Sequence, residues 1–165
     1  MGTRHRGPAR EVRALDAYIK LKRAVRSVDA CTLPALRAEK LTENQFAVLE
    51  LLWHLGPCAQ HEIGEKILTS RANVTLIVDQ LGRRGLVRRE RDAADRRCMR
   101  VELTEAGRRL IARIFPEHAA RLADAFSALT AAEQRELARL CRKLGRAAAA
   151  RQPPSSSSSA RRGMR

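Results

Sequence analysis

The chain has 165 residues, which is enough for one ordinary domain or for a small domain with a further helical appendage, and too few for two independent catalytic domains. Its 33 basic and 18 acidic residues give a formal charge of +15, which favours a polyanionic partner, with nucleic acid ahead of an anionic membrane. Because the chain contains only one Trp, one Tyr and three Phe, its core must be largely aliphatic, and we expect helices.

Both ends of the chain have the composition of disordered tails. Residues 1–10 are basic and contain glycine and proline, and residues 147–165 form a low-complexity segment rich in Ala, Ser and Arg. No segment approaches the ~18 uninterrupted apolar residues of a membrane-spanning helix, and no apolar stretch follows the N-terminal charges. We therefore expect a cytoplasmic protein without a membrane partner.

Two amphipathic helices are predicted ahead of the most basic part of the chain. Apolar residues at three- and four-residue spacing predict a helix over about 11–30 that ends before Pro34. A second helix begins at Thr42, which has capping-box spacing with Gln45, and ends at Gly56.

A short helix, a turn and a longer helix follow. The short helix covers about 60–68, the polar pair Thr69-Ser70 interrupts the pattern, and Gly85 ends the longer helix. The buried stripe of the longer helix is predicted to consist of Val74, Ile77, Val78 and Leu81. This succession is typical of a helix-turn-helix, whose second helix lies in the major groove of DNA.

After Gly85 the apolar period changes to two, which predicts strands. Leu86-Val87 opens one strand, and the polar segment 92–97 is expected to be the turn of a hairpin. The apolar positions of the second strand are Met99, Val101 and Leu103.

Two helices complete the prediction. Thr104 caps a long helix that Pro116 kinks, and Thr130 forms a capping box with Glu133 at the start of the last helix. The last helix is predicted to bury Leu137, Leu140, Cys141 and Leu144. The order ααααββαα predicts a mainly α fold with a small β-hairpin wing, a winged helix-turn-helix.

The exposed face of the longer helix carries side chains suited to reading bases. Arg71 can bond bidentately to guanine, Asn73 to adenine, and the methyl group of Ala72 suits contact with thymine. The full set of exposed positions is Ser70, Arg71, Ala72, Asn73, Thr75 and Leu76. The alternative is that these residues only cap and solvate a surface helix.

The charge of the hairpin region favours DNA over that alternative. Between Arg71 and Arg100 there are nine arginines and four acidic residues. An arginine at the hairpin tip can enter a narrow minor groove, and arginines on its flank can neutralise phosphates. The predicted wing contacts are Arg88, Arg89, Arg91, Asp95, Arg96 and Arg97.

Three motifs stand out in the chain: the segment DAADRR, the LTEAG that follows the second strand, and the S-x-x-x-V-T-x-x-V-D-x-L pattern from Ser70 to Leu81. Through these motifs, residues 11–146 resemble the MarR (multiple antibiotic resistance regulator) family. The family commonly has Gly-Leu in the turn where this chain has Leu68-Thr69.

The resemblance implies a homodimer built from interlocked helices. Residues 11–40 and 104–146 would form the dimerisation region, and residues 41–103 the DNA-binding region. In this arrangement the two recognition helices enter successive major grooves. Arg97 enters the minor groove and is held by Asp95.

The resemblance also implies release from DNA by a small aromatic or phenolic effector or by cysteine oxidation. Candidate pocket residues are Tyr18, Trp53, His54, Phe115 and His118, although packing in the core is the stronger interpretation for Trp53 and Phe115. Cys98 lies among wing arginines that would stabilise a thiolate, which makes it the candidate redox switch. Cys141 is expected to be buried, whereas exposure is plausible at Cys31 and Cys58.

We therefore expect a dimeric, sequence-specific regulator, most simply a repressor of a pseudo-palindromic operator on double-stranded DNA. The alternative is a sequence-blind basic architectural protein, for which the charge alone would suffice. The sequence shows no nucleophile with a nearby base, no glycine-rich phosphate loop and no paired carboxylates in an apolar setting, so we do not expect an enzyme, a cofactor or a metal site.

Overall fold

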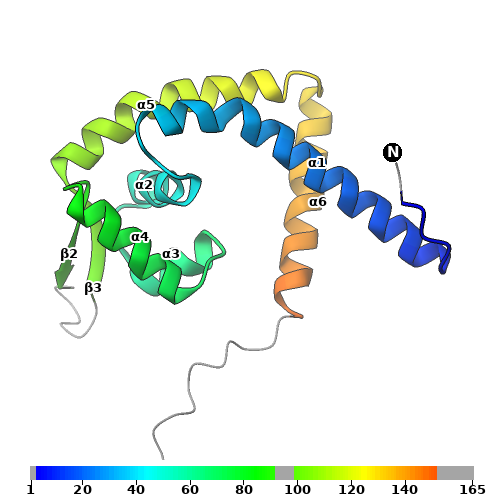
Figure 1. Ribbon diagram of the computed structural model, residues 1–165, viewed down its shortest axis with the longest axis horizontal. Coiled ribbons are helices and arrows are strands. Elements are labelled where there is room, and N and C mark those ends of the chain that lie inside the picture. Colours follow the sequence, from blue (N-terminus) through cyan, green and yellow to red (C-terminus); the bar gives the residue numbers. More distant parts are fainter. Residues whose placement is uncertain (1–2, 92–98, 152–165) are drawn as a thin grey trace, which may run out of the picture. The chain divides into compact units, whose positions relative to one another are not determined.

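The computed structural model describes residues 3–91 and 99–151. The chain forms two compact units, Met1–Ala125 and Phe126–Arg165. In the described part of the first unit the elements are α1 (Ala9–Ala38), α2 (Glu43–Leu55), β1 (Cys58–Ala59), α3 (Gln60–Lys66), α4 (Arg71–Arg83), β2 (Val87–Arg91), β3 (Met99–Leu103) and α5 (Glu105–Ala125), and the second unit contains α6 (Ala131–Ala149) (Figure 1). The predicted fold class, helices with a small antiparallel sheet, is confirmed.

Helix α1 was predicted to end before Pro34, but it continues to Ala38. It also begins at Ala9, inside the segment predicted to be disordered. Proline cannot donate to the carbonyl of Ala30, yet both residues are exposed, so water can satisfy that oxygen. The turn that follows buries Leu36 in the core. The burial of Leu36 offsets the lost hydrogen bond, and α5 likewise continues through the exposed Pro116.

Helix α2 begins with the predicted capping box. The hydroxyl of Thr42 accepts from the backbone N–H of Gln45 at 3.2 Å, and the side-chain oxygen of Gln45 accepts from the N–H of Thr42 at 3.0 Å. The buried amide of Gln45 also donates to Oε1 of Gln80 at 2.9 Å. One side chain therefore caps α2 and ties it to α4.

The sheet has a strand that the sequence did not predict. β1 is two residues long and pairs antiparallel with β3, so the order is β1-β3-β2. Cys58, whose exposure the sequence made plausible, is buried in this strand at 5% relative exposure. The predicted hairpin strands pair from Val87↔Leu103 to Arg91↔Met99, while the predicted turn lies outside the described residues.

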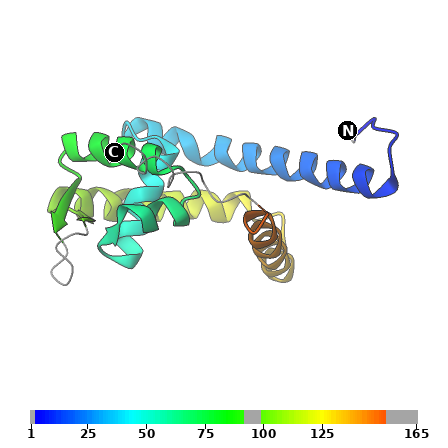
Figure 2. The same ribbon diagram turned by 90° about the horizontal axis from the view of Figure 1, so that it is seen from below.

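The hydrophobic core of the first unit lies between α2, α4, the sheet and α5, and the end of α1 and Ile63 of α3 add to it. The predicted stripe of α4 is buried there. Figures 1 and 2 show the N-terminal half of α1 projecting beyond the other elements of this unit, and no residue of α1 before Thr32 is buried among the described residues.

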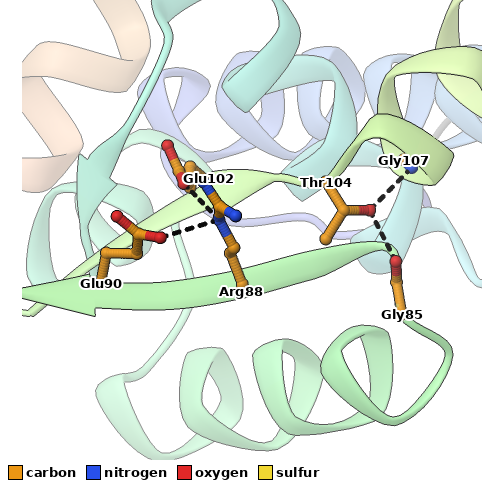
Figure 3. A network of polar contacts seen from close by, with 6 residues as sticks. All are labelled: Gly85, Arg88, Glu90, Glu102, Thr104 and Gly107. Carbon is orange, nitrogen blue, oxygen red and sulfur yellow. Dashed lines mark hydrogen bonds and ion pairs between the residues drawn. The ribbon is translucent and has the colours of Figure 1, made fainter.

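A polar junction joins β2, β3 and α5 (Figure 3). The hydroxyl of Thr104 donates to the carbonyl of Gly85 at 2.6 Å and accepts from the N–H of Gly107 at 3.1 Å. The backbone N–H of Thr104 donates to the carbonyl of Leu86 at 3.1 Å. The Thr and Gly of the LTEAG segment thus cap α5 and fix its start against the first residues after α4.

Helix α6 has the predicted capping box of Thr130 and Glu133 and extends three residues beyond the predicted end at 146. Its predicted burial is wrong for this single chain, since no residue of α6 is buried in the described part of the protein. Leu140 and Leu144 are 47% and 58% exposed, and Cys141 is exposed as well. An amphipathic pattern indicates a face that packs, but it does not say which surface covers that face.

No helix in the described residues is both long and apolar enough to cross a membrane.

Candidate nucleic-acid interface

Helices α3 and α4 approach each other closely through Gly64. A Cβ atom at Gly64 would lie 3.2 Å from the carbonyl oxygen of Thr69 and 3.2 Å from Cγ2 of Val74. The backbone N–H of Thr69 donates to the carbonyl of Gly64 at 3.0 Å. Together these contacts hold the turn and the first buried residue of α4 against α3, which is the packing a helix-turn-helix requires.

The turn contains a strained residue. Leu68, which stands where the family commonly has glycine, adopts φ +54° and is 87% exposed. This left-handed backbone brings the Cβ of a non-glycine residue close to its own carbonyl, at a cost of about 1 kcal/mol or more.

We expect the Leu68→Gly variant to be about 0.5–1 kcal/mol more stable to unfolding, because glycine removes the strain and little buried surface is lost. Denaturant unfolding measures this difference. Leu76→Gly is the matched control, since Leu76 is also exposed, at 51%, but stands inside α4. That variant should lose about 1 kcal/mol from poorer helix propensity. Equal changes at the two positions would contradict the strain at Leu68.

The first turns of α4 present the predicted reading face. The hydroxyl of Ser70 accepts from the N–H of Asn73 at 3.2 Å and so caps the helix as expected. Of the predicted positions, Asn73 is half-buried and the others are exposed, namely Ser70, Arg71, Ala72, Thr75 and Leu76. The buried stripe on the opposite side directs this face away from the core.

Two of these polar side chains already have partners within the chain. The amide of Asn73 donates to the hydroxyl of Thr69 at 2.7 Å, and the hydroxyl of Thr75 donates to the carbonyl of Arg71 at 3.1 Å. The Arg71 guanidinium has no hydrogen bond or ion pair within residues 3–91 and 99–151. Arg71 is therefore the most available donor on this face.

The described wing arginines also differ in whether they have a partner within the described part of the chain. Arg88 forms ion pairs with Glu102 at 2.5 Å and with Glu90 at 3.0 Å (Figure 3). Arg89 pairs with Asp79 of α4 at 2.6 Å. Arg91 is exposed and has no such partner among the described residues. Contact of Arg88 or Arg89 with phosphate would thus compete with an existing pair, whereas Arg91 has no ion pair among the described residues.

The remaining wing predictions, Asp95, Arg96, Arg97 and Cys98, lie outside the described residues.

The C-terminal end of α4 is tethered to two other helices. Arg84 donates to the carbonyl of Lys40 at 2.7 Å and to that of Glu39 at 2.9 Å. The carboxylate of Glu39 accepts two hydrogen bonds from Arg113 of α5, both 2.8 Å long. These bonds from the Arg113 guanidinium lower the pKa of Glu39. The orientation of α4 is thus fixed at both of its ends.

Sequence comparison agrees with this geometry. The MarR family model matches residues 41–99. YkoM of Bacillus subtilis (strain 168), an uncharacterized HTH-type transcriptional regulator, is 38% identical over 133 residues, which are 81% of this chain and 86% of YkoM. The chain belongs to the MarR family.

Two further similarities support the membership. The transcriptional repressor MprA of Escherichia coli (strain K12) is 37% identical over 111 residues, which are 66% of this chain and 63% of MprA. Among solved structures, BpsR of Bordetella bronchiseptica, whose DNA binding is regulated by 6-hydroxynicotinic acid, is 30% identical with a TM-score of 0.69 over 76% of this chain and 89% of BpsR.

As a MarR-family protein the chain is a DNA-binding transcriptional regulator with a winged helix fold, and not an enzyme, which confirms those predictions.

In this MarR protein the two cavities described within residues 3–91 and 99–151 do not bring the five predicted pocket residues together. Tyr18 is 59% exposed on the part of α1 that packs on little else, and Trp53 is 38% exposed in the last turn of α2. His54 and Phe115 form an edge-on pair with ring centroids 5.1 Å apart. Of the five, only His118 lines a described cavity, where its ring lies 4.4 Å from that of Phe46.

Sequence reasoning missed residues whose role depends on contacts between distant segments. Gln60, the first residue of α3, donates to the hydroxyl of Thr75 at 3.4 Å and accepts from Arg89 at 3.3 Å, so it joins α3, α4 and β2. No local pattern marks this glutamine. The Arg84 and Glu39 contacts were missed for the same reason.

Among the described cysteines, Cys58 is unsuited to redox sensing, because burial raises the pKa of its thiol and disfavours the reactive thiolate.

Proposed function

We propose that the protein is a dimeric, sequence-specific repressor in the cytoplasm that binds a pseudo-palindromic operator and is released by a small aromatic ligand, with oxidation of Cys98 as a second route. The observation that supports it best is the exposed face of α4, with Arg71 free to contact a base while the buried stripe, Gln45 and Arg84 hold the helix in place. The formal charge of +15 supplies the sequence-independent attraction to phosphate.

The proposal of a homodimer is supported by apolar surface that the single chain leaves exposed. Each of two helices carries such residues at helical spacing, and one copy of the chain does not bury them. They are Leu15, Tyr18 and Val25 of α1 and Leu140 and Leu144 of α6. A second copy would cover these faces, so residues 11–40 and 104–146 remain our proposal for the dimerisation region and residues 41–103 for the DNA-binding region. A dimer places two α4 helices on one operator.

The proposal of repression and of release by a ligand draws on relatives. MprA is named a transcriptional repressor, and the DNA binding of BpsR is regulated by 6-hydroxynicotinic acid, a small aromatic compound. We propose the same kind of control here.

A footprinting and competition experiment tests the proposal. The protein should protect a short inverted repeat near its own promoter and should prefer it over random DNA by about 10³-fold or more at physiological salt. An architectural protein would instead show a steep salt dependence with little preference among sequences.

Arg71→Ala should weaken operator binding by about 1–3 kcal/mol and relax preference at one base pair of each half-site. A panel of single-base operator variants, measured by fluorescence anisotropy, detects the loss of preference. Arg121→Ala is the charge-matched control, since Arg121 lies on α5 in an ion pair with Glu117 at 2.8 Å. If Arg71→Ala weakened binding equally for every base variant, Arg71 would contact phosphate and would not read a base.

A further inference from the structure

A cavity of about 190 Å³ lies between α1, α2 and α5 of the first unit. Its apolar wall includes Leu33 and Leu36 of α1, Phe46 of α2 and Leu122 of α5. An apolar cavity of about 150 Å³ is enough to bind benzene. The space therefore suits one substituted ring.

Among the described residues, the charged side chains that line this cavity are all acidic. Asp29 of α1 and Glu43 and Glu50 of α2 contribute carboxylates, and no lysine or arginine of residues 3–91 and 99–151 contributes to the lining. In a chain of such high positive charge this local excess of negative charge stands out.

These three carboxylates are also unpaired. Within residues 3–91 and 99–151 none of them forms an ion pair. Other carboxylates of the same helices do, for example Asp16 of α1 with Lys20 and Glu117 of α5 with Arg121. Asp29 and Glu50 are only half-exposed, so water screens their charge incompletely.

His118 adds an imidazole ring to the lining. Burial lowers the pKa of His118, although the carboxylate of Glu50 acts in the opposite direction. A neutral imidazole carries one nitrogen that accepts a hydrogen bond. The Nδ1 atom is buried and has no hydrogen-bond partner in the described part of the chain. Among the described residues the cavity thus offers negative charge and no lysine or arginine that could receive an acid.

We propose that this cavity binds a small organic cation, an ammonium group carried on a single apolar or aromatic ring. The ammonium lies toward Asp29 and Glu50, and the ring packs against Phe46 and the leucines. An aromatic carboxylate is disfavoured, because it would bring a further negative charge among the three acids. This inference deepens the proposed function, on which it rests for the claim that occupation of the cavity changes DNA binding.

Three probes that share a ring and differ in charge test the inference. They are tyramine, a cation at neutral pH, 4-ethylphenol, which is uncharged, and 4-hydroxyphenylacetate, an anion. Isothermal titration calorimetry with the full chain should give tyramine the highest affinity, with the anion about tenfold weaker or more. If tyramine binds no more tightly than the other two, the inference is wrong.

A pair of isosteric variants tests whether the preference for the cation arises in this cavity. Glu50→Gln should reduce the affinity for tyramine several-fold and narrow its advantage over 4-ethylphenol. Glu65→Gln is the matched control, because it removes the same charge from an exposed position on α3 that does not line the cavity, and it should leave tyramine binding unchanged. Thermal unfolding of both variants verifies that they fold. An equal loss in both variants would overturn the assignment to the cavity.

Operator binding, measured with and without tyramine, separates the inference from the proposed function. In one outcome, the binding of tyramine depends on Glu50 and still leaves the operator complex intact. That result supports the cation site and contradicts release by this ligand. Failure to recognise any inverted repeat contradicts the proposed function, while the calorimetric comparison still decides the cation site.

Discussion

Replacing Gly107 by alanine is expected to lower the free energy of unfolding by about 3 kcal/mol or more, because the added Cβ would overlap the carbonyl oxygen of Leu86. That oxygen cannot retreat easily, since it accepts from the N–H of Thr104 at 3.1 Å. The variant must shift the start of α5 away from the segment between α4 and β2. Chemical denaturation followed by circular dichroism measures the loss.

Gly82→Ala is the control for this prediction. Gly82 lies in α4, where an added Cβ would meet nothing closer than the carbonyl oxygen of Val87, at 3.9 Å. Alanine is the better helix former, so this variant should gain about 0.5–1 kcal/mol. We expect the same substitution to lower the free energy of unfolding at Gly107 and to raise it at Gly82. A stable Gly107→Ala protein would show that α5 does not sit as tightly on Leu86 as the structure has it.

The second large effect is expected at Ile63. Helix α3 is seven residues long, and only Ile63 and Gly64 of it are buried. Ile63→Ala removes the one large side chain that anchors α3 in the core and leaves a cavity, at a cost of about 2–5 kcal/mol. Because α3 supports α4, operator affinity should fall as well, even under conditions where most of the protein is folded.

Leu76→Ala controls for the loss of a branched side chain. Leu76 is 51% exposed on α4, so truncation there should change the free energy of unfolding by no more than about 0.5 kcal/mol. Unfolding curves of both variants at one protein concentration give the comparison. Similar stability losses at the two positions would mean that Ile63 does not anchor α3.

Features encoded by neighbouring residues were predictable from the sequence. The capping residues Thr42, Ser70 and Thr130 act as their spacing predicted, and the buried stripe of α4 is complete. Each depends on contacts within one or two helical turns, where the period of the sequence and the geometry of the helix coincide. For the same reason the strands of the hairpin were found.

Features that depend on contacts between distant segments were not predictable from the sequence. Strand β1 has two residues and no period, and it exists only because Cys58 and Ala59 pair with Val101 and Arg100. The local rule that proline ends a helix failed at Pro34, where the burial of Leu36 outweighs it. The acidic cavity takes residues from helices far apart in the chain, so no motif could mark it.

The contact at the end of α4 depends on the identity of one of its partners and not on that of the other. Arg84 binds the peptide oxygens of residues 39 and 40, which every amino acid possesses. Any residue that tolerates φ +55° at position 40 can therefore replace Lys40 over evolutionary time without releasing α4. Position 84 is different, because its planar guanidinium supplies both donors at once. Among homologues, the orientation of α4 can therefore be kept while residues 39 and 40 vary. An alignment would then show only the arginine as constant.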